Sequence, residues 1–199
     1  HIDKAKYPYG FITSTIKSKD CRILDKTCRA NFYQMFWVKA GEVTIHIDSD
    51  TTHISESQCA FIDINQFYRI ETSSHFEVLA LQFTESFYCR HEIDIHFLES
   101  CVFFGNSKNL LKFTLHPSLK VILEQYYLSL QHICRQPFDK LLCHFAHNTV
   151  ERLLLFSQKE LLDSTHIPAV AEKSDHDIGN HFRQLIKQNS KDMKQVSYY

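Results

Sequence analysis

Glycine and proline are scarce in this sequence. Four of each occur among 199 residues, whereas average usage would place about 12 % of residues in these two types. Long linkers and low-complexity tracts are therefore not expected. No apolar run reaches the roughly 18 residues that a membrane span needs, and the first six residues lack the apolar segment typical of a signal peptide. The 22 basic and 23 acidic side chains almost cancel, so we expect no broad basic surface for nucleic acid.

The sequence also lacks the cysteine spacing of a disulfide framework. Its seven cysteines, an odd number, include no Cys-x-x-Cys pair. Most are expected to be free thiols that pack as small apolar side chains. We therefore expect a reducing compartment and a cytoplasmic location. The composition that remains, 44 % hydrophobic and 23 % charged, is typical of a packed globular core.

From Tyr9 to about Phe104 the sequence has the pattern of short β-strands. In one run Val43, Ile45 and Ile47 alternate with polar residues, which predicts one apolar face. The predicted strands are 32–38, 42–48, 51–54, 58–64, 67–71 and 76–83. Short strands joined by small polar turns predict a sandwich or a small barrel. Because some runs are apolar on both faces, we expect the following part of the chain to cover the outside of this barrel.

The second half of the chain has the pattern of helices. Pro117 suits a first helical turn, and apolar residues recur at helical spacing from Leu119 to Leu130. Pro137 ends this helix, and Asp139 begins a longer one. The apolar band of the longer helix is wide, so we expect one side to pack on the barrel and the other to meet a partner helix.

Residues 165–174 are predicted to be a linker, and helical patterns resume after it. The last of these patterns is still in progress at Tyr199, and the sequence does not begin with methionine. We therefore expect the chain to be part of a longer protein. Residues 172–199 hold five basic and four acidic side chains, which gives this stretch little electrostatic attraction to DNA.

Three motifs follow one another in the strand-rich half. The first is an aromatic strand that ends in a glycine turn, Phe36-Trp37-Val38-Lys39-Ala40-Gly41; the second is Ile64-Asn65-Gln66-Phe67-Tyr68; the third is Gln82-Phe83-Thr84-Glu85-Ser86-Phe87. Their order and spacing resemble the N-terminal cupin-like domain of AraC-family transcription regulators. In the second motif Ile64 replaces the usual proline and Tyr68 the frequent histidine, so the polar contact of that histidine is not carried over. The segment from Phe182 to Tyr199 resembles the start of the family's DNA-binding domain.

The resemblance implies an α+β chain, in which a cupin-like β-barrel (a double-stranded β-helix, or jelly roll) is followed by an α-helical dimerisation region. We assign 1–112 to the barrel sensor domain, 113–164 to a two-helix dimerisation and packing region, 165–174 to a linker and 175–199 to the start of a helix-turn-helix domain. The implied function is ligand-dependent transcription regulation without enzyme activity, cofactor or metal. The implied partners are a second copy of the chain, an unidentified small-molecule effector, and DNA through the region beyond Tyr199.

Two sets of candidate site residues follow. A small barrel has room for one ligand at its mouth, held by rings and one or two polar groups. This predicts a ligand set of Phe32, Trp37, His46, Phe61, Tyr68 and Phe83, although the same residues also suit a solid core. The dimerisation set is a stripe on the second helix, which predicts contacts through Leu142, Phe145, Thr149, Leu153 and Phe156.

The main alternative is a stand-alone cupin that binds a small molecule or catalyses a metal-dependent reaction. The nearest match to a metal-cupin motif, Gly41 followed by His46 and Asp48, has an unsuitable gap and a single histidine. A third possibility is a dimerisation module whose barrel binds nothing.

Two groups on the long helix are candidate chemical sites. His144, His147 and Glu151 share one helical face and suit either a chelate or a hydrated or hydrogen-bonded polar face, of which we favour the polar face. Cys143 and His144 are neighbours that point about 100° apart, which is poor geometry for a nucleophilic pair.

Overall fold

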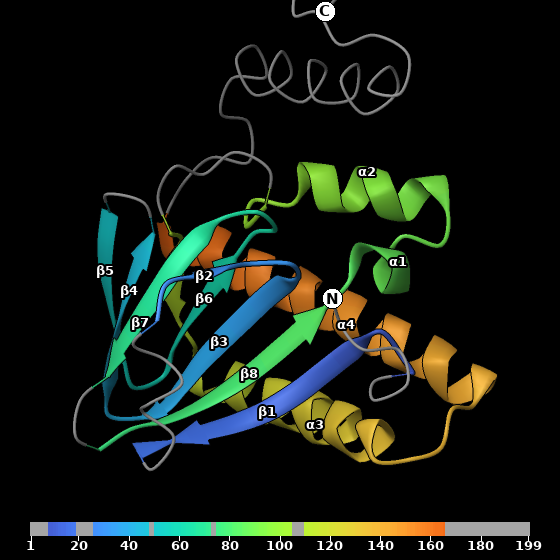
Figure 1. Cartoon of the computed structure of the whole chain (residues 1–199), viewed down its shortest axis with the longest axis horizontal. Coiled ribbons are helices and arrows are strands. Elements are labelled where there is room, and N and C mark those ends of the chain that lie inside the picture. Colours follow the sequence, from blue (N-terminus) through green and yellow to red (C-terminus); the bar gives the residue numbers. More distant parts are fainter. Residues whose placement is uncertain (1–7, 19–25, 48–49, 73–74, 105–109, 166–199) are drawn as a thin grey trace, which may run out of the picture.

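The computed structural model describes residues 8–18, 26–47, 50–72, 75–104 and 110–165. Its strands form two antiparallel sheets that face each other (Figure 1). The five-stranded sheet has the order β1 (Phe11–Lys17), β8 (Glu77–Phe83), β3 (Tyr33–Ala40), β6 (Gln58–Ile62) and β9 (Lys112–Thr114). The four-stranded sheet has the order β2 (Cys28–Arg29), β7 (Phe67–Thr72), β4 (Glu42–Ile47) and β5 (Asp50–Ser55).

Most strands pair with strands that are distant in the sequence. β1 and β3 both pair with β8, β3 also pairs with β6, and β2 and β4 both pair with β7. Only β4 and β5 form a hairpin between consecutive strands of one sheet. Apart from β8 and β9, which both lie in the five-stranded sheet, the chain otherwise crosses from one sheet to the other at each step, which is the jelly-roll arrangement. The predicted fold class is therefore confirmed.

Alternation along β3 divides the hydrophobic side chains between two layers. Tyr33, Met35 and Trp37 point away from the four-stranded sheet and belong to a core shared with the helices. Phe36 and Val38 point toward the four-stranded sheet and belong to a second core between the sheets. Because successive residues of a strand face opposite sides, the five-stranded sheet has an apolar surface on both faces.

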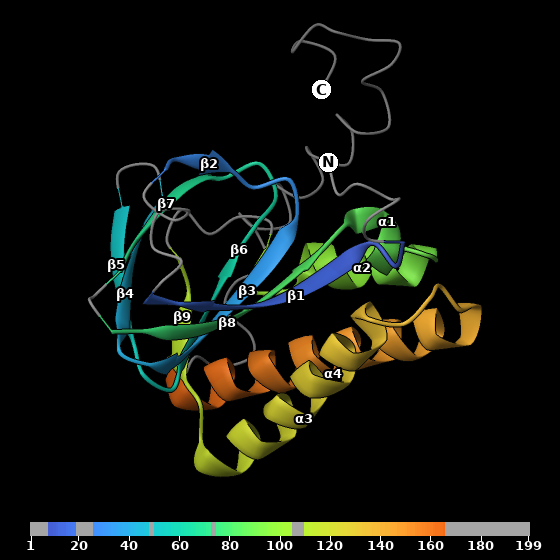
Figure 2. The same ribbon diagram turned by 60° about the horizontal axis from the view of Figure 1, so that its bottom comes forward.

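Helices cover the outer face of the five-stranded sheet. α3 (Pro117–Cys134) and α4 (Lys140–Thr165) pack against each other, α3 along β1 and α4 along β9 (Figure 2). Asp139 Oδ1 accepts a hydrogen bond from the Leu142 backbone N–H at 2.8 Å at the start of α4. The expected cover of the barrel, the proline break and the start at Asp139 are all confirmed. No described helix has the length and hydropathy that crossing a membrane requires.

The prediction of strands throughout the first half is wrong for residues 85–100. Two helices lie there, α1 (Glu85–Tyr88) and α2 (Glu92–Ser100), between β8 and β9. Thr84 begins α1, because its hydroxyl accepts the Phe87 N–H at 3.1 Å. The Asp94 carboxylate accepts the backbone N–H groups of Arg90 and His91, each at 2.9 Å, at the start of α2.

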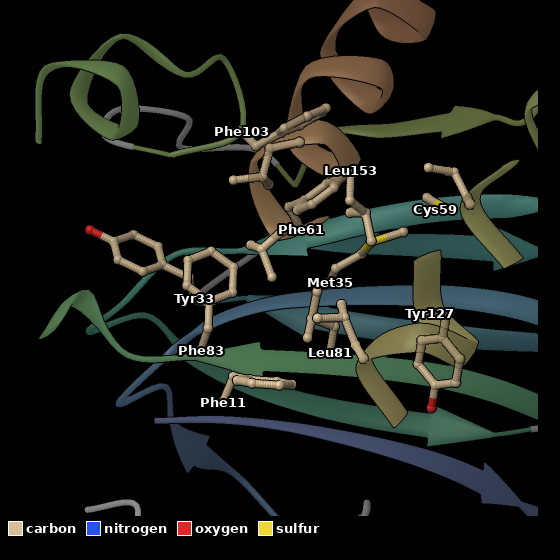
Figure 3. Packing of buried hydrophobic residues seen from close by; sticks show 14 of the residues in the cluster. Phe11, Tyr33, Met35, Cys59, Phe61, Leu81, Phe83, Phe103, Tyr127 and Leu153 are labelled. Carbon is tan, nitrogen blue, oxygen red and sulfur yellow. The ribbon is translucent and has the colours of Figure 1, made fainter. Parts of the chain in front are cut away.

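The core beneath the helices is rich in aromatic rings (Figure 3). The rings of Phe61 and Phe103 stack with their centroids 3.9 Å apart. Leu153 of α4 is 1 % exposed within the same core. The helices and the five-stranded sheet therefore share one hydrophobic core. The predicted linker after Thr165 and the predicted start of a helix-turn-helix domain lie outside the described residues.

Candidate functional site

A small apolar cavity lies between the two sheets. Its volume is about 10 Å³, which is room for about one water molecule. The five-stranded and four-stranded sheets contribute three side chains each to its lining, which consists of Ile16, Phe36, Val78, Val43, Ile45 and Ile70. Binding sites for drug-sized molecules measure roughly 300–1,000 Å³. In the structure as it stands this cavity is therefore a packing gap, and a ligand would have to open it.

Small side chains beside Phe36 explain why the sheets leave room there. Phe36 pairs with Ala60 on β6 and with Ala80 on β8, and Ala80 pairs in turn with Ser14 on β1. The inner face of the sheet thus has one ring in a row of small residues, and the row ends in Lys112 of β9, which pairs with Ala60. Tight packing between sheets requires interdigitating side chains, and short ones leave gaps.

Three uncharged polar side chains lie on the inner faces next to this row. Gln34 is 1 % exposed, and its Oε1 accepts hydrogen bonds from Gln82 Nε2 at 2.7 Å and from the Tyr68 hydroxyl at 3.2 Å. Gln34 and Gln82 are directly opposite each other on β3 and β8, whereas Tyr68 comes from the facing sheet. We call these three residues the amide cluster.

The hydroxyl of Tyr68 remains protonated and so remains a donor. Burial raises its pKa above the ordinary value of 10.0, and the hydrogen bond to Gln34 offsets only part of this rise. The ring of Phe36 lies 6.4 Å from that of Tyr68, centroid to centroid, and also lines the cavity. Phe36 therefore stands between the amide cluster and the cavity. We call the cavity, Phe36 and the amide cluster together the interior site.

One cationic side chain of the described strands faces the space between the sheets: Lys112 of β9 pairs with Ala60, is exposed, and donates from its Nζ to the His53 carbonyl of the facing sheet at 2.6 Å. Arg69 belongs to the opposite face of β7 from Tyr68 and pairs with Glu71 at 2.6 Å. Lys39 pairs with Glu124 of α3 at 2.8 Å. The interior site therefore combines neutral hydrogen-bonding groups and apolar surface, with the ammonium group of Lys112 at the edge of the sheet.

Of the six residues predicted to bind a ligand, Tyr68 faces the space between the sheets. Trp37, Phe61 and Phe83 are buried on the other side of the five-stranded sheet, in the core that contacts the helices. Phe32 is half-buried and precedes β3. Sequence alternation groups residues into two faces, but both faces of these strands are apolar, so it does not say which face is inside.

His46 also lies outside the sandwich. Its Nδ1 is 3.0 Å from Thr51 Oγ1, and its Nε2 is 3.2 Å from a carboxylate oxygen of Glu71. These residues form a polar surface on the outer face of the four-stranded sheet. Among the described residues, no group of three or more His, Cys, Asp or Glu side chains is arranged to hold a metal ion.

The two histidines of the long helix have separate partners. His147 is buried, and its Nε2–H donates to the Tyr88 carbonyl at 2.7 Å. His144 is exposed, with its Nδ1 3.1 Å from Arg90 Nη1. Both contacts agree with the favoured interpretation of a hydrated or hydrogen-bonded face, with His147 hydrogen-bonded inside the fold and His144 at the surface.

The predicted dimerisation stripe is divided between core and surface. Leu153 and Thr149 are buried within this chain, Leu142 is half-buried, and Phe145 and Phe156 are 54 % and 39 % exposed. The structure thus corrects the stripe, because its middle faces the chain's own core. The surface has other apolar residues that the stripe omitted, of which the most exposed are Leu141 and Leu155 on α4 and Val121 and Leu128 on α3.

Sequence reasoning missed Gln34, Gln82 and Phe36 as site residues. The available signal was a glutamine within an otherwise apolar strand, since a buried amide needs hydrogen-bond partners. Gln34 and Gln82 each interrupt such a run, in 33–38 and 78–83. A buried amide, Gln34, and a half-buried one, Gln82, on two apolar strands point to a paired interior position.

These features define a cupin-like jelly roll with a helical extension that covers one sheet. Among solved structures, apo ToxT from Vibrio cholerae strain SCE256 matches 94 % of this chain and 68 % of its own, with a TM-score of 0.50 at 12 % identity. ToxT is an AraC-family regulator, so the resemblance expected from the three motifs is confirmed at the level of the fold. No family model and no curated protein matches the chain.

Two further structures have lower scores. ToxT with an unsaturated fatty acid bound has a TM-score of 0.44 at 14 % identity, and the match covers 94 % of this chain and 65 % of that one. The cupin domain of Schizosaccharomyces pombe Cnp3 has a TM-score of 0.33 at 8 % identity, with 39 % of this chain and 58 % of that one covered.

Proposed function

We propose that this chain is the effector-sensing and dimerisation portion of an AraC-family DNA-binding transcription regulator. The observation that carries the proposal is the interior site, a cavity lined by both sheets and adjoined by buried amide and hydroxyl groups. The similarity of the fold to ToxT supports a regulator in preference to an enzyme. DNA would be bound through the region beyond Tyr199 of the full-length parent.

A ligand in the interior site would act on the helices through β3. Phe36 lines the cavity, whereas its neighbours Met35 and Trp37 pack in the core beneath α3 and α4. A ligand that moves Phe36 therefore moves the strand on which the helices rest. Binding would then favour one arrangement of sheet and helices over another, which is a population shift without covalent chemistry.

Ligand-dependent thermal unfolding tests the sensing role. A library of small uncharged, anionic and cationic metabolites is screened for an increase in Tm, because a ligand that binds only the folded state stabilises it. The variant Val78→Leu fills part of the cavity and should reduce the shift that a hit produces. Thr44→Val, on the outer face of the four-stranded sheet, should leave the shift unchanged. If no compound stabilises the wild type, the sensing role is refuted.

A stand-alone metal cupin is the second candidate function. It differs from a regulator in the metal content that it predicts for the purified chain. Elemental analysis of the purified chain would find a stoichiometric transition metal in that case. A regulator of the proposed kind would contain none.

We also propose that two copies meet through the outer surface of α3 and α4. This surface exposes Leu141, Phe145 and Leu155 on one helix and Val121 and Leu128 on the other. Exposed apolar side chains gathered on a helix pair are typical of an interface with a second copy.

Sedimentation tests the interface with two variants. Phe145→Asp changes an exposed residue and should give a folded monomer with an unchanged circular dichroism spectrum. Leu153→Asp places a charge in the core and should impair folding itself. A folded Phe145→Asp dimer of undiminished affinity would refute this interface.

A further inference from the structure

The end of α4 is held less firmly than the rest of the helix. We propose that residues 157–165 form a release segment, which opens from the sheet while the first part of α4 stays in place. Its opening would transmit a change in the barrel to the chain beyond Thr165, and this regulatory role rests on the proposed function.

The release segment begins with a polar residue inside the core. Ser157 is 0 % exposed, and its hydroxyl has no hydrogen-bond partner among the described residues. The buried Thr149 differs, because its hydroxyl donates to the Phe145 carbonyl at 2.8 Å. The side-chain oxygen of Gln158 is also buried and without a partner in the described part of the chain. Such groups lose their hydration on burial and gain no hydrogen bond, so they favour the state in which this turn reaches water.

The release segment also has few buried apolar side chains. The helix before it buries four of them in the core beneath the helices, namely Ala146, Val150, Leu153 and Leu154. Among the described side chains of the segment, Leu161 is the single apolar residue that is buried, whereas Lys159 and Asp163 are exposed. Regions with few buried apolar contacts open at a lower free energy than the rest of a fold.

A hydrogen bond at the surface ties the segment to the start of α3. Glu160 Oε1 accepts the backbone N–H of His116 at 2.7 Å. His116 is the N-cap residue of α3, where a carboxylate is favoured by the positive end of the helix dipole. Because this bond is exposed, water can replace either partner, and the bond can break without leaving a buried group unpaired.

β9 connects the Glu160–His116 bond with the interior site. Lys112 faces the space between the sheets and donates to the His53 carbonyl, whereas the next residue, Phe113, is buried in the core beneath the helices. β9 lies beside the C-terminal end of α4 (Figures 1 and 2), and His116 follows shortly after it. A ligand that opens the sheets at Lys112 would therefore displace the strand that positions His116 against Glu160.

Hydrogen–deuterium exchange of the full chain, measured for peptides from 146–154 and 157–165, tests the release segment. Ser157→Ala removes the unpartnered hydroxyl and should slow exchange in 157–165 about tenfold. The higher helix propensity of alanine accounts for only about two- to threefold of this effect. Exchange that slows threefold or less would therefore overturn the proposal.

Thr149→Val is the matched control, because it removes a buried hydroxyl of the same helix that has a partner. This variant should not slow exchange in either part of α4. Equal slowing by Thr149→Val and Ser157→Ala would show that loss of any buried hydroxyl has this effect, and would overturn the assignment to Ser157.

Variants of Glu160 test the bond to α3. Glu160→Ala should accelerate exchange in 157–165 about tenfold and leave 146–154 unchanged, because only the segment loses its connection. Glu160→Gln retains an oxygen acceptor for the His116 N–H and should have a smaller effect. Acceleration over the whole of α4 would overturn the proposal, since the segment would then not open by itself.

A compound that stabilises the chain in the metabolite screen tests the regulatory role. It should change exchange in 157–165 by about threefold more than in 146–154. A stabilising compound that affects both parts equally would refute the regulatory role and leave the sensing function intact. If no compound stabilises the chain, the proposed function and the regulatory role fail together, whereas Ser157→Ala still decides whether the segment opens by itself.

Discussion

At the scale of single residues, Gly41 shows how a backbone position restricts the side chain. Its φ is +73°, in the region that favours glycine, and a Cβ at this position would lie 2.0 Å from the carbonyl oxygen of His75. The turn between β3 and β4 therefore passes directly against the segment that leads into β8.

Gly41→Ala should destabilise the chain by more than about 1–3 kcal/mol, because backbone strain and a clash with main-chain atoms add. Chemical denaturation measures the loss. Gly10→Ala is the comparison: its φ is also positive, but its Cβ would meet the Phe87 side chain at 3.0 Å. Equal losses in the two variants would show that the clash at His75 is relieved by movement of the loop.

Protonation of the Asp94 carboxylate should destabilise the fold at acidic pH. Asp94 is 9 % exposed, and burial alone would raise its pKa. The hydrogen bonds from the backbone N–H groups of Arg90 and His91, together with the nearby His147, outweigh burial and lower the pKa below 3.8. A lowered pKa in the folded state means that the ionised carboxylate stabilises the fold above pH 3.8. This contribution is lost as the pH falls through the folded pKa.

Asp94→Asn should therefore cost about 1–2 kcal/mol at pH 7, the usual worth of a helix-capping carboxylate. The difference from the wild type should shrink as the pH falls below 3.8. Denaturation curves at pH 7, 5 and 3 measure this. The exposed Asp163, which pairs with Lys159 within α4, is the control, and its replacement by Asn should change stability little at any pH. A constant difference across this pH range would contradict the assignment.

The backbone conformation of a single residue can be predicted from the sequence where the chemistry of its own side chain determines it. Asn65 takes a φ of +70° in the turn before β7, a conformation that asparagine tolerates better than most residues. The side of the sheet that a residue faces was not predictable. Trp37 and Phe36 are adjacent aromatic residues on a strand that is apolar throughout, and only the final packing assigns one to the helices and the other to the interior.

At the scale of elements, Tyr9 links the start of the chain to the turn between α3 and α4. Its hydroxyl donates to the Pro137 carbonyl at 2.6 Å and accepts from the Asp139 N–H at 3.1 Å. Its ring also contacts that of Phe138, with the centroids 5.3 Å apart. One side chain therefore fixes both the end of the α3–α4 turn and the approach of α4 to the sheet.

Tyr9→Phe should retain the ring contacts and lose both hydrogen bonds. We expect a loss of about 1–3 kcal/mol, because the partner groups are partly buried. Hydrogen exchange should increase first in the turn and in the N-terminal part of α4, which would then open locally. Tyr126→Phe on α3 is the control, since the structure describes a ring contact with Phe156 for Tyr126 and no hydrogen bond of its hydroxyl. Uniform acceleration of exchange across the sheet would contradict a local role for Tyr9.

Element type could be predicted where periodicity was sustained. β4, with three alternating aliphatic residues, and α3, with apolar residues at helical spacing over several turns, both formed as expected. α2 did not, because Ile93, Ile95 and Phe97 alternate with polar residues as in a strand. Its helical state depends on Asp94, which caps the first turn, and on Leu98, which is buried against the core. A short segment of this kind takes its conformation from tertiary contacts.

At the scale of the whole molecule, the five-stranded sheet lies between two hydrophobic cores. One core lies beneath the helices and contains Trp37, which is 2 % exposed and is the only tryptophan of the chain. The other lies between the sheets and contains Phe36. Because adjacent residues of β3 belong to different cores, neither core should lose its packing while the other keeps it. The signal between ligand and helices that we propose depends on this coupling.

Phe36→Leu tests the coupling. The variant removes part of a ring from the interior core and should cost about 1–3 kcal/mol. Fluorescence of Trp37 reports unfolding of the helix-side core, and far-UV circular dichroism reports unfolding of the whole chain. If the cores unfold together, the variant shifts both transitions to the same lower denaturant midpoint. A fluorescence transition that stays at the wild-type midpoint while the dichroism transition moves would show two independent cores. β3 would then be unable to transmit a change at the interior site to α3 and α4.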